Sequence, residues 1–355
     1  MTANRRSGPQ ARPSGRSAAI NGNLRLGIIG AGAVVQVAHL PVLRKMKGIH
    51  IQALCDTDTP KARALAERSG ILDTFDDIED LLKHEELDAL LIATPNHLHE
   101  DHILAALAAD LHVLVEKPLS ISSKGAAKIA RAAETSGRVV MVGMTHRYRP
   151  DVQAVRSFVQ SGELGAIDSV RASWHLARPA RAPLGWRQRR GEAGGGAMLD
   201  LGLTMLDLCL WLSGNPAPKR VSASLSRPGG ERAVEQSGSA FVVCEKGCSI
   251  FVDVTWRHIG AGERFGVGLR GARGTAGINP LHVWKEINGV PHDVSPTGTT
   301  SRESAFIASF RAQWAHFLAA TRGEAAAPSL AEQVGVLGVL EAVYESDADG
   351  RDVTL

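Results

Sequence analysis

The stretch LRLGIIGAGAVVQ, residues 24–36, decides the fold. Its apolar residues predict a short strand that ends at Gly30-Ala31-Gly32, and the residues beyond predict a helix that reaches Lys47. Glycines between a strand and a helix let the main chain approach a pyrophosphate, which binds at the positive end of the helix. Val35 stands where the usual dinucleotide-binding pattern has its third glycine, so the interpretation depends on the surrounding sequence.

An acidic residue downstream supports that interpretation. A second strand, 51–55, ends at Asp56, 26 residues beyond Gly30. A carboxylate at this place can accept hydrogen bonds from both ribose hydroxyls and would repel a 2′-phosphate. We therefore expect NAD, with NADP as the alternative because Lys61 and Arg63 lie near Asp56 in the sequence. In a simpler alternative the glycines serve only a tight turn. The expected cofactor contacts here are Gly30, Gly32, Ala33, Val34 and Asp56.

The rest of the first half alternates between strands and helices, as a parallel, doubly wound sheet does. The predicted strands are 89–93, 112–115 and 139–142, and the helices between them are 100–109 and 123–136. We assign residues 24–143 to a Rossmann domain. Such sheets bind ligands at the carboxyl ends of their strands, where the loops 94–99 and 116–118 are expected. We interpret His97, His99 and His102 as part of a polar helix start, so we expect no metal site.

The second half contains an apolar helix, 198–212, directly after three glycines. Asp200, Thr204 and Asp207 are spaced i, i+4 and i+7, so a regular α-helix presents them as one polar stripe. Buried acids need partners or a polar cavity, so the stripe indicates either an active site or a structural network. The strands predicted around it are 169–175, 220–225, 239–243, 249–255 and 265–269, and the chain closes with helices at 303–321 and 330–346.

Composition narrows the class of protein. The 355 residues favour two domains, because single cores seldom grow beyond about 250–300 residues. The net charge of +3 includes four arginines in residues 1–23, which we expect to be a disordered tail; without them the chain has a net charge of −1. This argues against nucleic-acid binding. No stretch reaches the about 18 apolar residues of a membrane span. Four cysteines make no disulfide framework, so we expect a cytoplasmic protein.

Several motifs, taken in their order and spacing, resemble the Gfo/Idh/MocA family, named for glucose-fructose oxidoreductase, inositol dehydrogenase and a rhizopine-catabolism protein. The resemblance runs from about Leu24 to Leu355. The motifs that carry it are Gly30-Ala31-Gly32 with His39-Leu40-Pro41, Thr94-Pro95-Asn96-His97-Leu98-His99, Val115-Glu116-Lys117-Pro118-Leu119, Arg147-Tyr148-Arg149-Pro150, the run from Gly194 to Gly202, and the ending Glu341-Ala342-Val343-Tyr344-Glu345-Ser346.

The resemblance implies a role for each motif. Lys117 is identified as the lysine of the catalytic motif, with a cis bond to Pro118. The second domain, residues 144–355, is expected to be α+β, with a large, mainly antiparallel open sheet that binds substrate and forms a homodimer or homotetramer. Further cofactor contacts are expected from Thr94, Pro95, Asn96, His99, Glu116, Lys117 and Arg147. The sequence departs from the family at Thr204, where a histidine usually follows the aspartate by four residues.

The implied reaction is hydride transfer between nicotinamide and a carbinol carbon of a sugar, sugar acid, inositol or related polyol. Thr204 cannot act as the base, so Lys117 is the candidate, because burial and a neighbouring nicotinamide cation favour its neutral amine. Asp200 would orient the substrate or the lysine. His146 or His175 could supply the missing imidazole. Two alternatives stay open: a cofactor-binding regulator that has lost turnover, and a glycoside-cleaving enzyme that borrows and returns hydride.

The charge of the substrate is suggested by a local bias in composition. Residues 171–190 contain six arginines and no acid, and they lead directly into the glycine triplet. Arginine binds carboxylate or phosphate bidentately, so an anionic sugar that contacts Arg187 is one interpretation. The others are binding of the cofactor pyrophosphate, contact with a neighbouring subunit, and a solvated basic loop.

Overall fold

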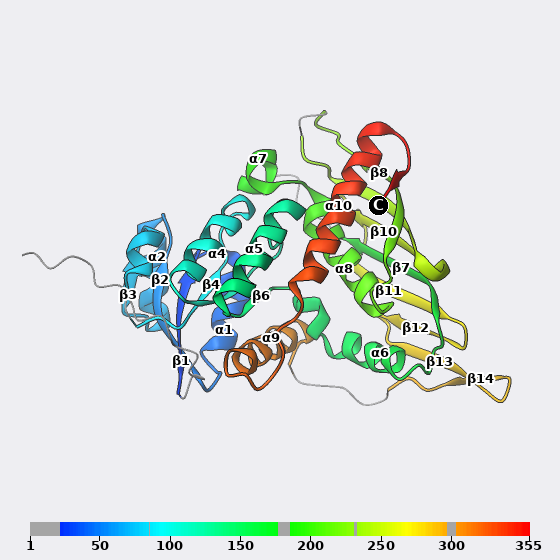
Figure 1. Cartoon of the computed structure of the whole chain (residues 1–355), viewed down its shortest axis with the longest axis horizontal. Coiled ribbons are helices and arrows are strands. Elements are labelled where there is room, and N and C mark those ends of the chain that lie inside the picture. The colour runs from blue at the N-terminus through cyan, green and yellow to red at the C-terminus, as the bar shows by residue number, and fades with distance from the viewer. Residues whose placement is uncertain (1–21, 85, 177–184, 231–232, 297–302) are drawn as a thin grey trace, which may run out of the picture.

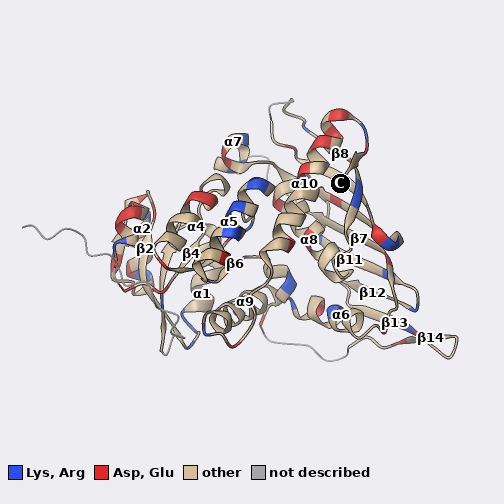
Figure 2. Cartoon of the chain, viewed as in Figure 1, with Lys and Arg blue, Asp and Glu red and all other residues tan. Residues whose placement is uncertain are grey.

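The protein contains two β-sheets that lie side by side, each covered by helices (Figure 1). The computed structural model describes residues 22–84, 86–176, 185–230, 233–296 and 303–355. The tail expected at residues 1–23 lies almost entirely outside these ranges. Figure 2 shows acidic and basic residues interspersed over the helices that cover the sheets.

The first sheet has six strands within the described residues, in the order β3-β2-β1-β4-β5-β6, and all its neighbouring strands pair in parallel. The strands are β1 (Leu24–Ile29), β2 (Ile49–Cys55), β3 (Asp73–Phe75), β4 (Ala89–Ile92), β5 (His112–Val115) and β6 (Val140–Val142). The prediction of a doubly wound parallel sheet is confirmed. The strand order reverses between β1 and β4, and ligands bind at such a reversal point in open parallel sheets.

Short capping motifs define the helices of this half. The side chain of Asp58 accepts a hydrogen bond from the Lys61 N–H at the start of α2, and α2 ends at Gly70 in a left-handed conformation. Ser122 and Gly137 bound α5 in the same way. The helices are η1 (Val35–His39), α1 (Leu40–Leu43), α2 (Thr59–Ser69), α3 (Ile78–Leu82), η2 (Asn96–Leu98), α4 (His99–Ala108) and α5 (Ser123–Ser136).

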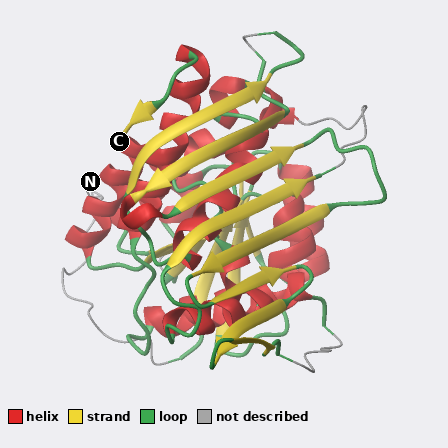
Figure 3. Ribbon diagram, turned by 90° about the vertical axis from the view of Figure 1, so that its right-hand side faces the viewer, coloured by secondary structure: helices red, strands yellow, loops and turns green. Residues whose placement is uncertain are grey.

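The second sheet is mainly antiparallel, as expected, with nine strands in the described part of the chain. Its order is β14-β13-β12-β11-β7-β10-β9-β8-β15, in which β7 and β10 pair in parallel. Figure 3 shows one face of this sheet without a covering helix. The strands are β7 (Ile167–His175), β8 (Pro218–Ser226), β9 (Ser237–Cys244), β10 (Ser249–Thr255), β11 (Arg264–Gly271), β12 (Gly274–Ile278), β13 (His282–Ile287), β14 (Val290–Asp293) and β15 (Val353–Thr354).

Helices α6 (Pro150–Gln160), α8 (Leu203–Leu212) and α10 (Leu330–Asp349) cover the other face of the second sheet. The remaining helical segments of this half are η3 (Thr145–Tyr148), η4 (Gly185–Gln188), α7 (Arg190–Ala193), η5 (Met198–Gly202) and η6 (Glu245–Gly247), of which η6 joins β9 to β10. Of the described residues, the helical stretch Arg190–Leu212 is long and apolar enough to span a membrane by length and composition. An apolar segment of 18 residues within this stretch is 89% buried inside the protein, so we interpret the stretch as a core helix.

Helix α9 (Ala305–Thr321) joins the two halves. It comes late in the chain but packs on α1 and η1 of the first half. Phe310, Trp314 and Phe317 are 5%, 0% and 0% exposed, so these aromatic residues belong to the core. They share that core with Leu24 of β1 and Val35 of η1.

Candidate active site

The glycine turn after β1 leaves main chain open at the reversal point of the parallel sheet. Gly30 has φ +98°, and a Cβ there would lie 2.5 Å from the main-chain oxygen of Ala93. At Gly32 nothing lies within 4 Å of where a Cβ would be. Gly32 therefore offers an open surface that a pyrophosphate can approach, as a dinucleotide-binding turn requires.

Asp56 lies against this turn from the end of β2. Its carboxylate accepts hydrogen bonds from the N–H groups of Ala31, at 2.7 Å, and Asp58, at 2.9 Å, and Lys61 Nζ lies 2.9 Å from Oδ1. Burial alone would raise the pKa of Asp56, but these hydrogen bonds outweigh it and lower that pKa. An ionised carboxylate beside the turn suits the ribose contact predicted for Asp56.

A cleft of about 200 Å³ opens between the two halves of the chain, next to Gly32. The first half lines it with Gly32, Ala33, Val34, Thr94, Asn96 and Glu116. Lys117, Arg187 and Asp200 complete the predicted residues in its lining. Two tryptophans that the sequence did not single out, Trp186 and Trp256, also line it.

Lys117 and Asp200 meet in this cleft. Lys117 Nζ donates to Asp200 Oδ1 at 2.6 Å and to the main-chain oxygen of Asp200 at 2.7 Å. The indole N–H of Trp256 donates to Asp200 Oδ2 at 3.2 Å. Both oxygens of the carboxylate are therefore held, and Lys117 and Asp200 line the cleft as a pair. The Lys117–Pro118 peptide bond is cis, as the resemblance implied.

Glu116 is hydrogen-bonded to His39, which belongs to the motif His39-Leu40-Pro41. Glu116 Oε1 lies 2.8 Å from His39 Nε2, and the indole N–H of Trp314 donates to His39 Nδ1 at 3.0 Å. An indole N–H can only donate, so Nδ1 is an acceptor and His39 donates to Glu116 through Nε2–H. Burial alone would raise the pKa of Glu116, but the hydrogen bond from His39 and nearby positive charges lower it.

His99 supports two loops and does not line the cleft, contrary to expectation. It is fully buried, with Nδ1 2.7 Å from the oxygen of Pro118 and Nε2 3.0 Å from the oxygen of Thr94. Burial lowers its pKa. Gly30, Asp56 and Pro95 are also absent from the lining. His99, Gly30 and Pro95 lie in or against the loops whose other residues are expected to contact the cofactor.

Arg147 does not line the cleft, although we expected it to contact the cofactor. Its guanidinium donates to both oxygens of Asp207, at 2.6 and 2.8 Å, and to Glu332 at 2.5 Å. The side chain is 9% exposed. All three nitrogens are committed to carboxylates that are distant in sequence, so Arg147 joins η3 to α8 and α10.

The predicted polar stripe is divided by helix geometry. Met198–Gly202 forms a π-helical turn, which holds more residues per turn than an α-helix, so a regular helical wheel does not apply across it. Asp200 faces the cleft, whereas Asp207 binds Arg147. Thr204 is 3% exposed and does not line the cleft.

Neither candidate histidine supplies the missing imidazole. His146 packs against Trp174 and Phe265, with ring centroids 4.9 and 5.2 Å away, and burial and nearby positive charge lower its pKa to about 3. Such a group is a poor proton acceptor near neutral pH. His175 binds Asp253 at 2.7 Å, and both residues alternate with the buried residues of their strands, so they lie on the uncovered face of the second sheet. Alternate residues of a strand face opposite ways, so Trp174 points to the helices and His175 points away from them.

The arginine-rich segment borders the cleft only in part. Arg187 lines it and stacks on Trp186, with 4.5 Å from Cζ to the ring centroid. Arg189 pairs with Glu192, and Arg171 lies on the uncovered sheet face. Arg178 and Arg181 lie outside the described residues.

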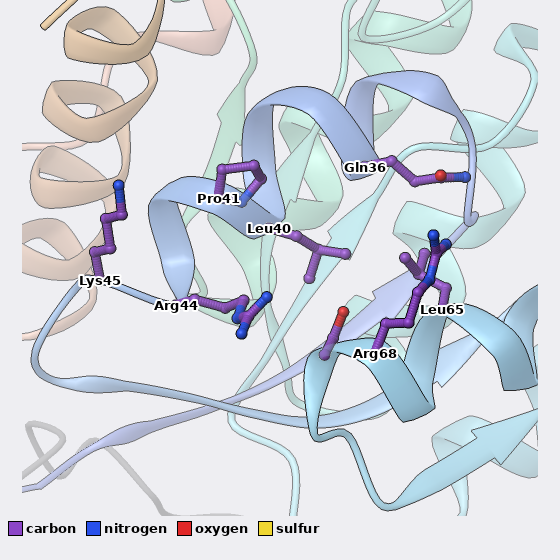
Figure 4. Close-up of a pocket in the computed structure, with 8 residues that line it drawn as sticks. Gln36, Leu40, Pro41, Arg44, Lys45, Leu65 and Arg68 are labelled. Carbon is purple, nitrogen blue, oxygen red and sulfur yellow. The ribbon is translucent and has the colours of Figure 1, made fainter.

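A second hollow lies apart from this chemistry. It has a volume of about 610 Å³ and lies between α1 and α2, with Arg44 and Arg68 on its rim and Leu40 and Leu65 inside it (Figure 4). None of the residues predicted to bind cofactor or substrate lines it. We assign the active site to the smaller cleft, because that cleft contains Lys117 and Asp200.

Comparison with known proteins defines the class. Residues 24–144 match the model of the Gfo/Idh/MocA oxidoreductases with an NAD-binding Rossmann fold, and residues 152–276 match the C-terminal domain of the same family. Together these regions exceed half of the chain. This protein therefore belongs to the Gfo/Idh/MocA family of NAD-binding oxidoreductases.

Among the relatives that match are proteins named for sugar chemistry. The chain is 33% identical to D-glucoside 3-dehydrogenase of Escherichia coli (strain K12) over 63% of its length, and the match spans 64% of that enzyme. It is 31% identical to the putative UDP-kanosamine synthase oxidoreductase subunit of Amycolatopsis mediterranei (strain S699), over 72% of this chain and 75% of that protein. The structure of GenD2 from gentamicin A biosynthesis, in complex with NAD, matches with a TM-score of 0.81 and 27% identity, over 97% of this chain and 99% of that one.

Proposed function

We propose that this protein oxidises a carbinol carbon of a sugar or polyol, or reduces the corresponding ketone. The observation that carries the proposal is the contact of 2.6 Å between Lys117 Nζ and Asp200 Oδ1, in the cleft that Gly32 also lines. When bound there, NAD supplies the carbon that exchanges hydride. Gly32 and its neighbours would hold the phosphates, and Asp56 the ribose. Lys117, as the neutral amine, would take the proton of the substrate hydroxyl in the oxidation and, as the ammonium, return it in the reduction, while Asp200 orients the lysine.

The substrate we propose is a sugar that carries a substituent at its anomeric carbon. D-glucoside 3-dehydrogenase and the putative UDP-kanosamine synthase subunit support this choice by their names. Trp186 and Trp256 give the cleft two aromatic side chains, and the apolar faces of a sugar ring can pack on such rings. The intact Lys117–Asp200 pair favours turnover over a regulator that has lost it.

An anionic group on the substrate would bind Arg187, the arginine that lines the cleft. Its stacking on Trp186 holds the guanidinium in one orientation. We expect Arg187→Ala to raise the KM of a uronic acid or sugar phosphate about tenfold or more, and the KM of the matching neutral sugar much less. Equal KM changes for the two sugars would contradict the proposal that Arg187 binds an anionic group of the substrate.

The experiment that tests the activity is a turnover screen with purified protein. Glucosides, sugar acids, sugar phosphates and inositols are offered with NAD or NADP, and NADH formation is followed with product analysis. We expect a keto sugar as the product, with NAD preferred. Hydrolysed glycoside without net NADH would instead indicate borrowed hydride, and no turnover with retained NAD binding would indicate a regulator.

We also propose that copies associate through the uncovered face of the second sheet. Phe241 and Phe251 face each other on neighbouring strands there and are 40% and 38% exposed. A hollow of about 430 Å³ lies beside Phe251 and is floored by Gly266 and Gly268. A two-fold contact could place the aromatic side chains of each copy in the hollow of the other. Phe251→Glu should then convert the oligomer to monomer in light scattering, and a wild-type monomer would contradict the proposal.

A cytoplasmic location is proposed as well. The four cysteines are free thiols and all are buried, which suits a reducing compartment. Fractionation of the producing cells tests the location, and recovery outside the cytoplasm would contradict it.

A further inference from the structure

A buried carboxylate outside the cleft holds the main chain in front of the helix that carries Asp200. Glu235, between β8 and β9, is 2% exposed. Its Oε1 accepts hydrogen bonds from the N–H groups of Gly196, at 2.7 Å, and Met198, at 2.9 Å, and from the hydroxyl of Tyr344 at 2.9 Å. Its main-chain oxygen accepts from the N–H of Ala197 at 2.9 Å. One residue therefore binds three consecutive N–H groups.

The glycine triplet is explained by this contact. A Cβ on Gly196 would lie 2.0 Å from the main-chain oxygen of Glu235, and a Cβ on Gly195 would lie 2.0 Å from the hydroxyl of Tyr344. Gly194 has φ +83°, a conformation that favours glycine. The triplet lets Glu235 and Tyr344 approach the main chain more closely than any side chain would permit.

The same segment determines where Asp200 lies. The N–H of Asp200 donates to the main-chain oxygen of Gly196 at 2.8 Å, and its side chain binds Lys117. A displacement of Gly196 would therefore be transmitted to Asp200 and change its contact with Lys117. Lys117 itself comes from the other half of the chain, at the end of β5.

We propose that Glu235 and Tyr344 are positioning residues that set the placement of Asp200 against Lys117. They form a clamp, the Glu235–Tyr344 clamp, and they influence turnover without touching the substrate. The link to turnover rests on the proposed function.

A carboxylate and a phenol suit this role on physical grounds. The first N–H groups of a helix have no partners within the helix, and its N-terminus favours negative charge. Hydrogen bonds from N–H groups to a carboxylate are also stronger than those between neutral groups. Burial and the charge of Glu235 raise the pKa of Tyr344, so its hydroxyl stays a donor.

The test compares the two tyrosines of the chain. Tyr344→Phe removes the hydroxyl from the clamp, whereas Tyr148→Phe removes a hydroxyl that lies 2.9 Å from His316 Nδ1, outside the cleft. Amide hydrogen exchange at 196–198 is measured on both variants, together with kcat and KM for NAD and for a glucoside. We expect Tyr344→Phe to speed this exchange, to lower kcat between about tenfold and a hundredfold, and to leave the KM for NAD unchanged. Tyr148→Phe should change neither exchange nor kcat.

Glu235→Gln provides a second variant, because glutamine keeps an acceptor oxygen but adds N–H donors beside Gly196 and Met198. We expect the same loss of kcat with NADH binding retained. If either variant loses only thermal stability and keeps kcat within about twofold of wild type, the positioning role is overturned. If the wild-type protein turns over no sugar, the proposed function fails. Amide hydrogen exchange then tests the Glu235–Tyr344 clamp alone, and unchanged protection at 196–198 in both variants overturns the clamp.

Discussion

Replacing Lys117 by methionine tests the proposed chemistry most directly, because methionine keeps most of the length of the side chain and removes the ammonium. Lys117 Nζ makes contacts of 2.6 and 2.7 Å with Asp200. A positioned group that transfers a proton contributes about 10²–10⁴-fold to a rate. We expect kcat to fall by that factor.

The fold should tolerate this change. Lys117 and Asp200 are 24% and 22% exposed, and Asp200 keeps the hydrogen bond from Trp256. Water screens a pair at this exposure, so we expect the free energy of unfolding to change by about 1 kcal/mol. The dissociation constant for NADH should stay close to that of wild type, because the phosphate and ribose contacts remain.

Steady-state kinetics, NADH fluorescence titration and thermal unfolding give the three quantities. Lys128→Met is the matched control, since Lys128 is 56% exposed and its contact, at 2.9 Å, is with Glu100. If Lys117 and Asp200 act as a unit, Asp200→Asn added to Lys117→Met should reduce kcat little further. Turnover of Lys117→Met within about tenfold of wild type would refute the proton-transfer role, and loss of NADH binding would assign the lysine to the cofactor.

Three further predictions concern the cofactor, pH and the missing histidine. Wild-type protein should bind NAD more tightly than NADP. Asp56→Ala should narrow the difference between the two dissociation constants, because the carboxylate beside the glycine turn is lost. Tighter binding of NADP by the wild type would show that Asp56 does not select NAD over NADP. Burial lowers the pKa of His112 from 6.5 to about 4, so the unfolded chain takes up this proton at higher pH than the folded protein does. Stability is then complete above pH 6.5 and falls as the pH drops toward about 4, by about 3 kcal/mol for this group. His112→Asn should reduce that slope in denaturant titrations, and an unchanged slope would contradict this assignment. Thr204→His should lower stability by about 1–3 kcal/mol, since Thr204 is 3% exposed, and should not raise kcat; faster turnover would show that the site accepts an imidazole there.

The parallel sheet was predictable because its signals are local. The apolar run before Gly30, the acid at the end of β2 and the regular alternation of strands and helices all lie within short stretches of sequence. The contact between Lys117 and Asp200 spans 83 positions, and only the resemblance to a family suggested that both residues belong to one site.

Residues whose partners lie far away in sequence were misplaced or missed. Nothing near Arg147 shows that Asp207 and Glu332 occupy its guanidinium. Trp256 follows Asp200 by 56 positions and stands alone after a strand, so no pattern marks it. Glu235 similarly lies between two strands with no pattern that marks it, and its role appears only when the glycine triplet packs on it.

The late position of α9 has a consequence for biosynthesis. Trp314 completes the core beneath the parallel sheet, yet it follows its partner His39 by 275 positions. At about 5–20 residues per second, a ribosome needs on the order of tens of seconds to make that much chain. Throughout this time the nascent cofactor half lacks the helix that covers α1 and η1, and its apolar surface is open to chaperones or to other nascent chains. A chain that ends before residue 305, or that continues from there into a fusion partner instead of α9, would keep this apolar surface exposed permanently.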